Sequence, residues 1–139
     1  MVKIVIDANV LISAAFGGTP LDAIRKAFSE GKVYLSPDVV AEIGETIVRL
    51  SPKLGEERTK NLISLWDRFQ SLCRMEEPVR RVLASRDPKD DAYLSLCASI
   101  GAQYLITGDK DLLVVDPARE PTLPRALKIL TPREYLEMD

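Results

Sequence analysis

The chain has 139 residues, of which 46% are hydrophobic and 29% are charged. This length and composition predict one globular domain over residues 1–139, and the formal net charge of -2 argues against both a disordered chain and a uniformly basic nucleic-acid binder. The sequence contains no histidine, which excludes Ser-His-Asp and Cys-His catalytic sites.

No membrane segment or disulfide is expected. The first apolar run, Val2–Ile6, is interrupted by Asp7 and is too short for a signal-peptide core or a membrane span. Cys73 and Cys97 are far apart and have apolar neighbours, so they read as buried thiols in a reducing compartment. We therefore expect a cytoplasmic protein.

The first half of the chain alternates between strand and helix patterns. Val2–Ile6 is rich in β-branched residues and predicts a central strand, and apolar residues at helical spacing over 21–28 predict a helix. Val33–Leu35 predicts a second strand. Ser36 and Pro37 then suit the N-cap and first position of a helix whose apolar stripe extends to Leu50.

The second half continues the alternation. Helices are predicted from about 55 to 72 and from 87 to 100, a strand at Leu105–Ile106, and another at Ala126–Leu130 after a proline-rich loop. A capping box over 131–134 starts a short terminal helix. Strands that alternate with helices predict right-handed crossovers and a parallel sheet covered on both faces, hence an α/β fold.

Several acidic residues occupy unusual positions. Asp7 directly follows the first strand; an ordinary turn aspartate is the alternative, but the apolar run that resumes at Val10 makes a purely solvating side chain unfavourable. Asn9 could orient a neighbouring carboxylate with its amide or could be a helix N-cap. Glu42 lies at the edge of the apolar stripe of its helix, although most glutamates simply face solvent.

Three carboxylates crowd the turn that precedes the helix at 87–100. Asp87 suits an N-cap, and Asp90 can reach back to it as an imperfect capping box, which leaves Asp91 without a capping role. Mutual repulsion in one turn is costly unless a cation occupies the site.

Asp109 follows the strand at 105–106 through a glycine turn, and Asp111 is predicted to cap a short helix. The Thr107 hydroxyl is level with Asp109 and could bind a metal-bound water. Asp7 and Asp109 both end predicted strands, so they should share the rim of a parallel sheet where ligands bind. Hard oxygen ligands without histidine suit Mg²⁺ or Mn²⁺.

Four sequence features together carry a family resemblance. They are Val-Ile-Asp-Ala-Asn-Val-Leu-Ile-Ser at 5–13, a glutamate in the helix after the second strand, Asp-Pro-Lys-Asp-Asp-Ala-Tyr-Leu at 87–94, and Tyr-Leu-Ile-Thr-Gly-Asp-Lys-Asp-Leu at 104–112. Over nearly its whole length the chain resembles PIN-domain ribonucleases. The ending Ile-Leu-Thr-Pro-Arg-Glu-Tyr-Leu at 129–136 is similar to the subgroup of toxin components of toxin-antitoxin systems, close to the VapC-type toxins.

The resemblance implies a three-layer α/β/α sandwich with a central, mostly parallel sheet, and Mg²⁺- or Mn²⁺-dependent endonucleolytic cleavage of single-stranded RNA. It also implies an antitoxin partner and a homodimer. The four acids of the family fall on Asp7, Glu42, Asp91 and Asp109, with supporting polar positions on Asn9 and Thr107. Two departures stand out: Ala8 replaces a hydroxyl residue found in many relatives, and the doublet Asp90-Asp91 makes the third acid ambiguous by one residue.

Basic residues flank the acidic segments. Arg86, Lys89 and Lys110 are candidates for phosphate contacts, with charge balance on a solvated surface as the alternative. If the acids bind cations, the remaining surface is net positive and admits a polyanionic substrate.

Two other functional interpretations also fit the sequence. A phospho-receiver signalling domain also places acids and Mg²⁺ on the rim of a parallel sheet, and a PIN scaffold could bind RNA or protein without cutting. The apolar stripe of the helix at 55–72 has two interpretations, core packing or a groove for a partner helix or second protomer. Its members are Leu62, Leu65, Trp66, Phe69 and Leu72.

Overall fold

The computed structural model describes residues 1–79, 82 and 91–138. Its centre is a five-stranded sheet in the order β3-β2-β1-β4-β5, and every neighbouring pair of strands is parallel. The strands are β1 (Val2–Ile6), β2 (Gly31–Leu35), β3 (Arg74–Met75), β4 (Tyr104–Ile106) and β5 (Lys128–Leu130).

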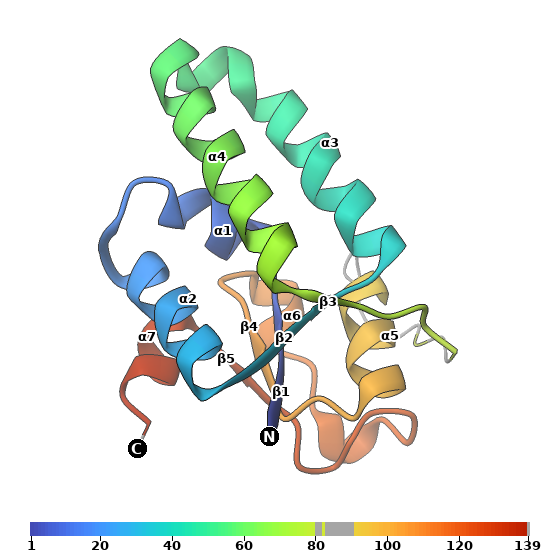
Figure 1. Ribbon diagram of the computed structural model, residues 1–139. Helices are drawn as coiled ribbons and strands as arrows, with labels where there is room; N and C mark the ends of the chain where they lie inside the picture. Colours follow the sequence, from blue (N-terminus) through green and yellow to red (C-terminus); the bar gives the residue numbers. More distant parts are fainter. Residues whose placement is uncertain (80–81, 83–90, 139) are drawn as a thin grey trace.

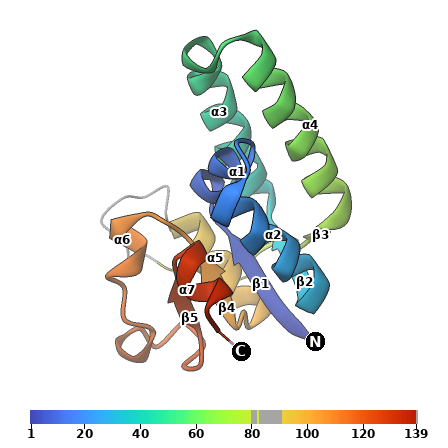
Figure 2. The ribbon, with the colours of Figure 1, turned by 90° about the vertical axis from the view of Figure 1, so that its left-hand side faces the viewer.

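Helices cover both faces of this sheet, with α1, α2 and α7 on one face and α5 on the other (Figures 1 and 2). The long helices α3 and α4 form a hairpin that projects beyond the sheet (Figure 1). The helices are α1 (Ala8–Ala14), α2 (Gly18–Glu30), α3 (Pro37–Leu54), α4 (Glu56–Leu72), α5 (Asp91–Ile100), α6 (Lys110–Leu113), a 3₁₀ turn (Pro117–Arg119) and α7 (Pro132–Leu136).

The predicted three-layer α/β/α architecture is confirmed. The structure differs from the prediction at element ends and in short elements. β5 begins at Lys128, two residues later than predicted, and the edge strand β3 was not predicted because it has only two residues, both exposed. The helix predicted from 87 is described from Asp91 onward, and 87–90 lie outside the described residues.

The core forms around β1, whose Ile4, Val5 and Ile6 are almost completely buried. Central strands of a parallel sheet are covered on both faces, which explains the continuous apolar run. Both cysteines are free thiols; burial raises the pKa of Cys73 to about 12 and also raises the pKa of Cys97. They therefore act as small apolar groups. None of the helices in the described part of the chain is long and apolar enough to cross a membrane.

The apolar stripe of α4 is divided between two environments. Leu62, Trp66 and Phe69 are buried in the core, which confirms the packing interpretation for them. Leu72 is 60% exposed. With Leu65 it lines an apolar groove of about 690 Å³ between α1, α2 and α4.

Gly31 is required by a close approach between strands. It pairs with Val2, and a Cβ atom at Gly31 would overlap the Val2 carbonyl oxygen.

We expect Gly31→Ala to destabilise the protein by about 1–3 kcal/mol, because the overlapping atom is backbone and cannot move without shifting β1. Urea unfolding measures this change. Gly44→Ala is the matched control: its Cβ would meet no atom within 4 Å, so this helical substitution should stabilise by about 0.5–1 kcal/mol. Equal effects at both positions would contradict the strand-contact argument.

Candidate functional site

The site begins where two neighbouring strands end. Ile6 of β1 pairs with Ile106 of β4, and the Asp7 amide donates a 3.0 Å hydrogen bond to the Ile106 carbonyl. Asp7 follows β1, and Asp109 follows β4 after two intervening residues. The two aspartates therefore share the carboxyl-end rim of the sheet, as the sequence predicts.

Asp7 is buried, with only 3% of its surface exposed. Its Oδ2 accepts a 2.6 Å hydrogen bond from the Thr107 hydroxyl, and its Oδ1 accepts a 3.3 Å bond from the Asn9 backbone N–H. Burial raises the pKa of Asp7 above its ordinary value, and the negative charge of Asp109 raises it further. Hydrogen bonds from Thr107, the Asn9 backbone and Tyr93 offset only part of this rise.

Asp7 also caps helix α1, which corrects one alternative from the sequence. Asn9 is not the N-cap; it lies inside α1, and its backbone rather than its side-chain amide contacts the carboxylate. The helix begins at Ala8 because an aspartate in extended conformation at its N-terminus satisfies a free backbone N–H.

Thr107 connects the two aspartates. Its buried hydroxyl donates to Asp7 and accepts a 3.0 Å hydrogen bond from the Asp109 backbone N–H. Asp109 is half-buried and accepts a 2.8 Å bond from the Asp111 backbone N–H. Asp109, not Asp111, therefore caps α6, because this helix begins at Lys110, before the predicted start. The loop after β4 is thus fixed to the end of β1.

Tyr93 is a site residue that sequence reasoning missed. Its hydroxyl oxygen, contributed by α5, accepts a 3.1 Å hydrogen bond from the Ala8 backbone N–H. Burial raises the pKa of Tyr93, and so do the negative charges of Asp7 and Glu42. The phenol therefore stays protonated and can donate its hydrogen to Asp7. It sits within the 87–94 motif, but a tyrosine on an apolar helix looks like a core residue.

Glu42 and Asp91, the other two predicted acids, lie on two other helices. Glu42 on α3 is half-buried, and its Oε1 accepts a 3.3 Å hydrogen bond from the Thr46 hydroxyl. Its charge acts on Tyr93, so it lies on the same side of the molecule as Asp7. Asp91 is the first residue of α5 and is half-buried.

The remaining predicted residues separate into two groups. Lys110 is exposed at the start of α6, beside Asp109. Arg86, Lys89 and Asp90 lie outside the described residues.

The chemistry of these donors suits a divalent cation. Asp7 and Asp109 offer hard carboxylate oxygens, and the raised pKa of Asp7 shows an electrostatic cost that a nearby cation would relieve. Within residues 1–79, 82 and 91–138, however, no group of three or more His, Cys, Asp or Glu side chains is close enough together to hold a metal ion. The described carboxylates are thus not grouped into a metal-binding cluster.

The burial of Asp7 predicts how stability depends on pH without divalent ions. A carboxyl whose folded-state pKa is raised stabilises the fold when protonated, and this contribution is lost as pH rises above its ordinary value of 3.8. In EDTA at pH 7.5, Asp7→Asn should therefore melt a few degrees higher than wild type, and the difference should shrink towards pH 4.

Mn²⁺ provides the complementary measurement. It should stabilise wild type by about 2.7 kcal/mol at about 100 times its Kd, and Asp7→Asn much less. A wild type that melts above Asp7→Asn in EDTA at pH 7.5, with an equal Mn²⁺ response in both proteins, would refute this account of Asp7.

Comparisons with known proteins agree with this fold. The family model described as "PIN domain" matches residues 3–111. A solved structure described as VapBC2 from Rickettsia felis bound to a DNA fragment from their promoter is similar, with a TM-score of 0.60 and 14% identity over 91% of this chain and 98% of that one. PAE2754 from Pyrobaculum aerophilum has a TM-score of 0.58 and 19% identity, over 91% and 83% of the two chains. No curated protein matches. At these identities the structural matches show the fold, whereas the family model covers most of the sequence: the chain belongs to the PIN domain family.

Proposed function

We propose that this chain is an endoribonuclease that cleaves single-stranded RNA with Mg²⁺ or Mn²⁺ and acts as the toxin of a toxin-antitoxin pair. The observation that carries the proposal is the buried Asp7 carboxylate, held by Thr107 and Tyr93 beside Asp109 in a chain of the PIN domain family. A buried charge next to another carboxylate is unfavourable without a counterion, so it indicates a functional site.

The ion would be held by four acids, Asp7, Glu42, Asp109 and either Asp91 or Asp90. The described carboxylates do not form a metal-binding group by themselves, so Glu42 and the third acid would join Asp7 and Asp109 when the ion binds. When bound, the ion would lower the pKa of an attacking water and neutralise charge that develops on the phosphate.

The chain's own residues would position the carboxylates, donate a hydrogen bond and contact the charged phosphates. Thr107 fixes Asp7 and the loop bearing Asp109 at the same rim, so little rearrangement would accompany the reaction. Tyr93 stays protonated because its pKa is raised, so it would act as a hydrogen-bond donor and not as a general base. Arg86, Lys89 and Lys110 would contact substrate phosphates.

The ends of the products would reveal the nucleophile. In-line attack by water leaves a 5′-phosphate and a 3′-hydroxyl, whereas attack by the ribose 2′-hydroxyl leaves a cyclic phosphate. With no histidine in the chain to activate a 2′-hydroxyl, we expect the first outcome.

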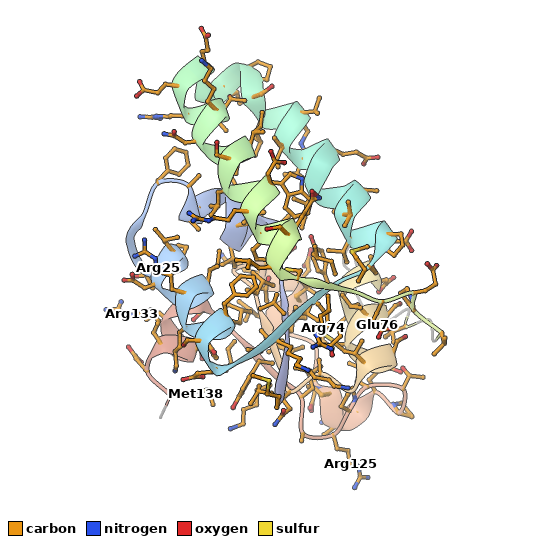
Figure 3. The ribbon with its side chains drawn as sticks, in the orientation of Figure 1. Arg25, Arg74, Glu76, Arg125, Arg133 and Met138 are labelled. Carbon is orange, nitrogen blue, oxygen red and sulfur yellow. The ribbon has the colours of Figure 1, made fainter. Side chains whose placement is uncertain are left out.

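Structural similarity to a VapBC complex supports an antitoxin protein as partner. The apolar groove between α1, α2 and α4 would suit a partner helix, with Arg25 and Arg68 among its lining residues (Arg25 is labelled in Figure 3). We also propose a homodimer and a cytoplasmic location, which a measured solution mass and cell fractionation would test.

The phospho-receiver alternative has less support. It requires a phosphorylatable aspartate at the end of a middle strand, whereas the third strand along the described part of the chain, β3, is an edge strand followed by Glu76. A PIN scaffold that binds without cutting is the remaining alternative, and the cleavage assay below separates it from a nuclease.

The central prediction is metal-dependent cleavage of RNA. End-labelled single-stranded RNA incubated with the purified protein and Mn²⁺ should be cut to products with 5′-phosphate ends, and EDTA should abolish cleavage. Asp109→Asn should lower the rate about 100-fold or more, a loss of the size caused by removing one preorganised electrostatic contact.

Asp116→Asn is the matched control for Asp109→Asn. Asp116 caps the 3₁₀ turn by accepting a 3.0 Å hydrogen bond from the Ala118 backbone N–H, much as Asp109 caps α6. It is exposed and is not one of the proposed ligands. Its substitution should leave the rate unchanged. Equal losses in both variants, or cleavage that persists in EDTA, would overturn the metal mechanism.

A further inference from the structure

We propose that a small pocket beside the acids binds the nucleotide on one side of the scissile phosphate and selects its base. The inference rests on the proposed ribonuclease function and deepens it. The pocket, called here the side pocket, has a volume of about 230 Å³ and is lined by Asn9, Val10, Ser13, Pro20, Gly108 and Pro132.

The side pocket borders the acid site, because two of its lining residues are close in sequence to the two aspartates. Asn9 is two residues after Asp7, and its backbone N–H donates to the Asp7 carboxylate. Gly108 lies between Thr107 and Asp109, the residues that connect the ends of β1 and β4. A nucleotide whose phosphate reaches these aspartates would therefore have its sugar and base next to the side pocket.

The polar groups of the pocket suit a nucleobase edge. Asn9 and Ser13 lie four residues apart on α1 and so share one face of this helix. Both are exposed, and neither side chain forms a hydrogen bond with another described residue. An amide offers a donor and an acceptor, and a hydroxyl offers both as well, which matches the mixed pattern along a base edge.

The apolar walls suit the faces of a base. Pro20 from α2 and Pro132 from α7 contribute ring carbons, and Gly108 contributes no side chain. A Cβ at Gly108 would meet no atom within 4 Å, so this wall is open space that a ligand could use. The volume is below the roughly 300–1,000 Å³ of pockets for drug-sized ligands, which favours a single nucleotide unit.

The two proline walls are fixed relative to each other. The Lys26 Nζ of α2 donates to the carbonyls of Tyr135 at 2.7 Å and Met138 at 2.9 Å, which ties α7 and the residues after it to α2 (Met138 is labelled in Figure 3). Pro132 is the first residue of α7 and directly follows Thr131, the N-cap of its capping box. The pocket is therefore preformed, which lowers the ordering cost of binding.

Abasic RNA and a pocket-filling variant test the proposal together. Cleavage with Mn²⁺ is measured on an RNA oligonucleotide, and on copies that lack one base on either side of the scissile phosphate. Ser13→Leu fills the side pocket. Ser71→Leu, at an exposed serine on α4 that does not line the pocket, is the matched control, and circular dichroism checks the fold of both.

Wild type should lose about tenfold in kcat/KM when the base on one side is removed, and Ser13→Leu should lose a similar factor on the intact RNA. Ser13→Leu should then be indifferent to removal of that same base, whereas Ser71→Leu should behave like wild type. The same pattern should appear in the Kd for RNA measured by fluorescence anisotropy in an Asp7→Asn background.

The contrary outcomes are distinct. One contrary result is that wild type cleaves RNA equally well whichever base is removed. Another is that Ser13→Leu and base removal lower kcat/KM independently, so that their two factors multiply. Either result would show that the side pocket is not a base site and would leave the ribonuclease proposal standing. If wild type cleaves no RNA with Mn²⁺, the proposed function fails and the pocket inference fails with it.

Discussion

The structure depends on one interaction, the 2.6 Å hydrogen bond from the Thr107 hydroxyl to the buried Asp7 carboxylate. It joins the residues that follow β1 and β4, which are 100 positions apart in the chain. The same hydroxyl accepts the Asp109 backbone N–H, so one threonine sets the positions of both strand-end aspartates. A hydrogen bond to a charged group is shorter and stronger than a neutral one, which suits this linking role.

The burial of Asp7, which the proposed function needs, lowers the stability of the free protein. The hydrogen bonds that Asp7 accepts do not fully offset its burial, so its pKa stays raised and its ionised form is unfavourable in the free protein. A neutral side chain that can still cap α1, such as asparagine, would avoid this cost. Retaining a carboxylate there makes physical sense when a cation or a polyanionic substrate with its counterions restores the balance.

The site residues that come directly after strands could be predicted from the sequence. Parallel strands leave their carboxyl ends at one rim, so the sequence alone places Asp7 and Asp109 together. Which residue caps a helix depends on where the helix begins, and a shift of one or two residues changes the cap. The sequence therefore assigned the cap of the short helix after β4 to Asp111 and considered Asn9 for the helix after β1, whereas Asp109 and Asp7 are the caps. Tyr93 could not be found, because its contact with Ala8 spans 85 positions and has no periodic pattern.

The C-terminal helix shows how packing far from the acids can shape the same rim. α7 has five residues and could not persist as an isolated helix, so its position comes from its capping box and from α2. Lys26 supplies two hydrogen bonds to backbone carbonyls of this segment and lies 4.5 Å from the centre of the Tyr135 ring, whose hydroxyl donates to Glu30 at 3.0 Å. Because Pro132 begins this helix and lines the pocket beside Asp7, contacts on α2 that look purely structural also help to shape the space next to the proposed catalytic acids.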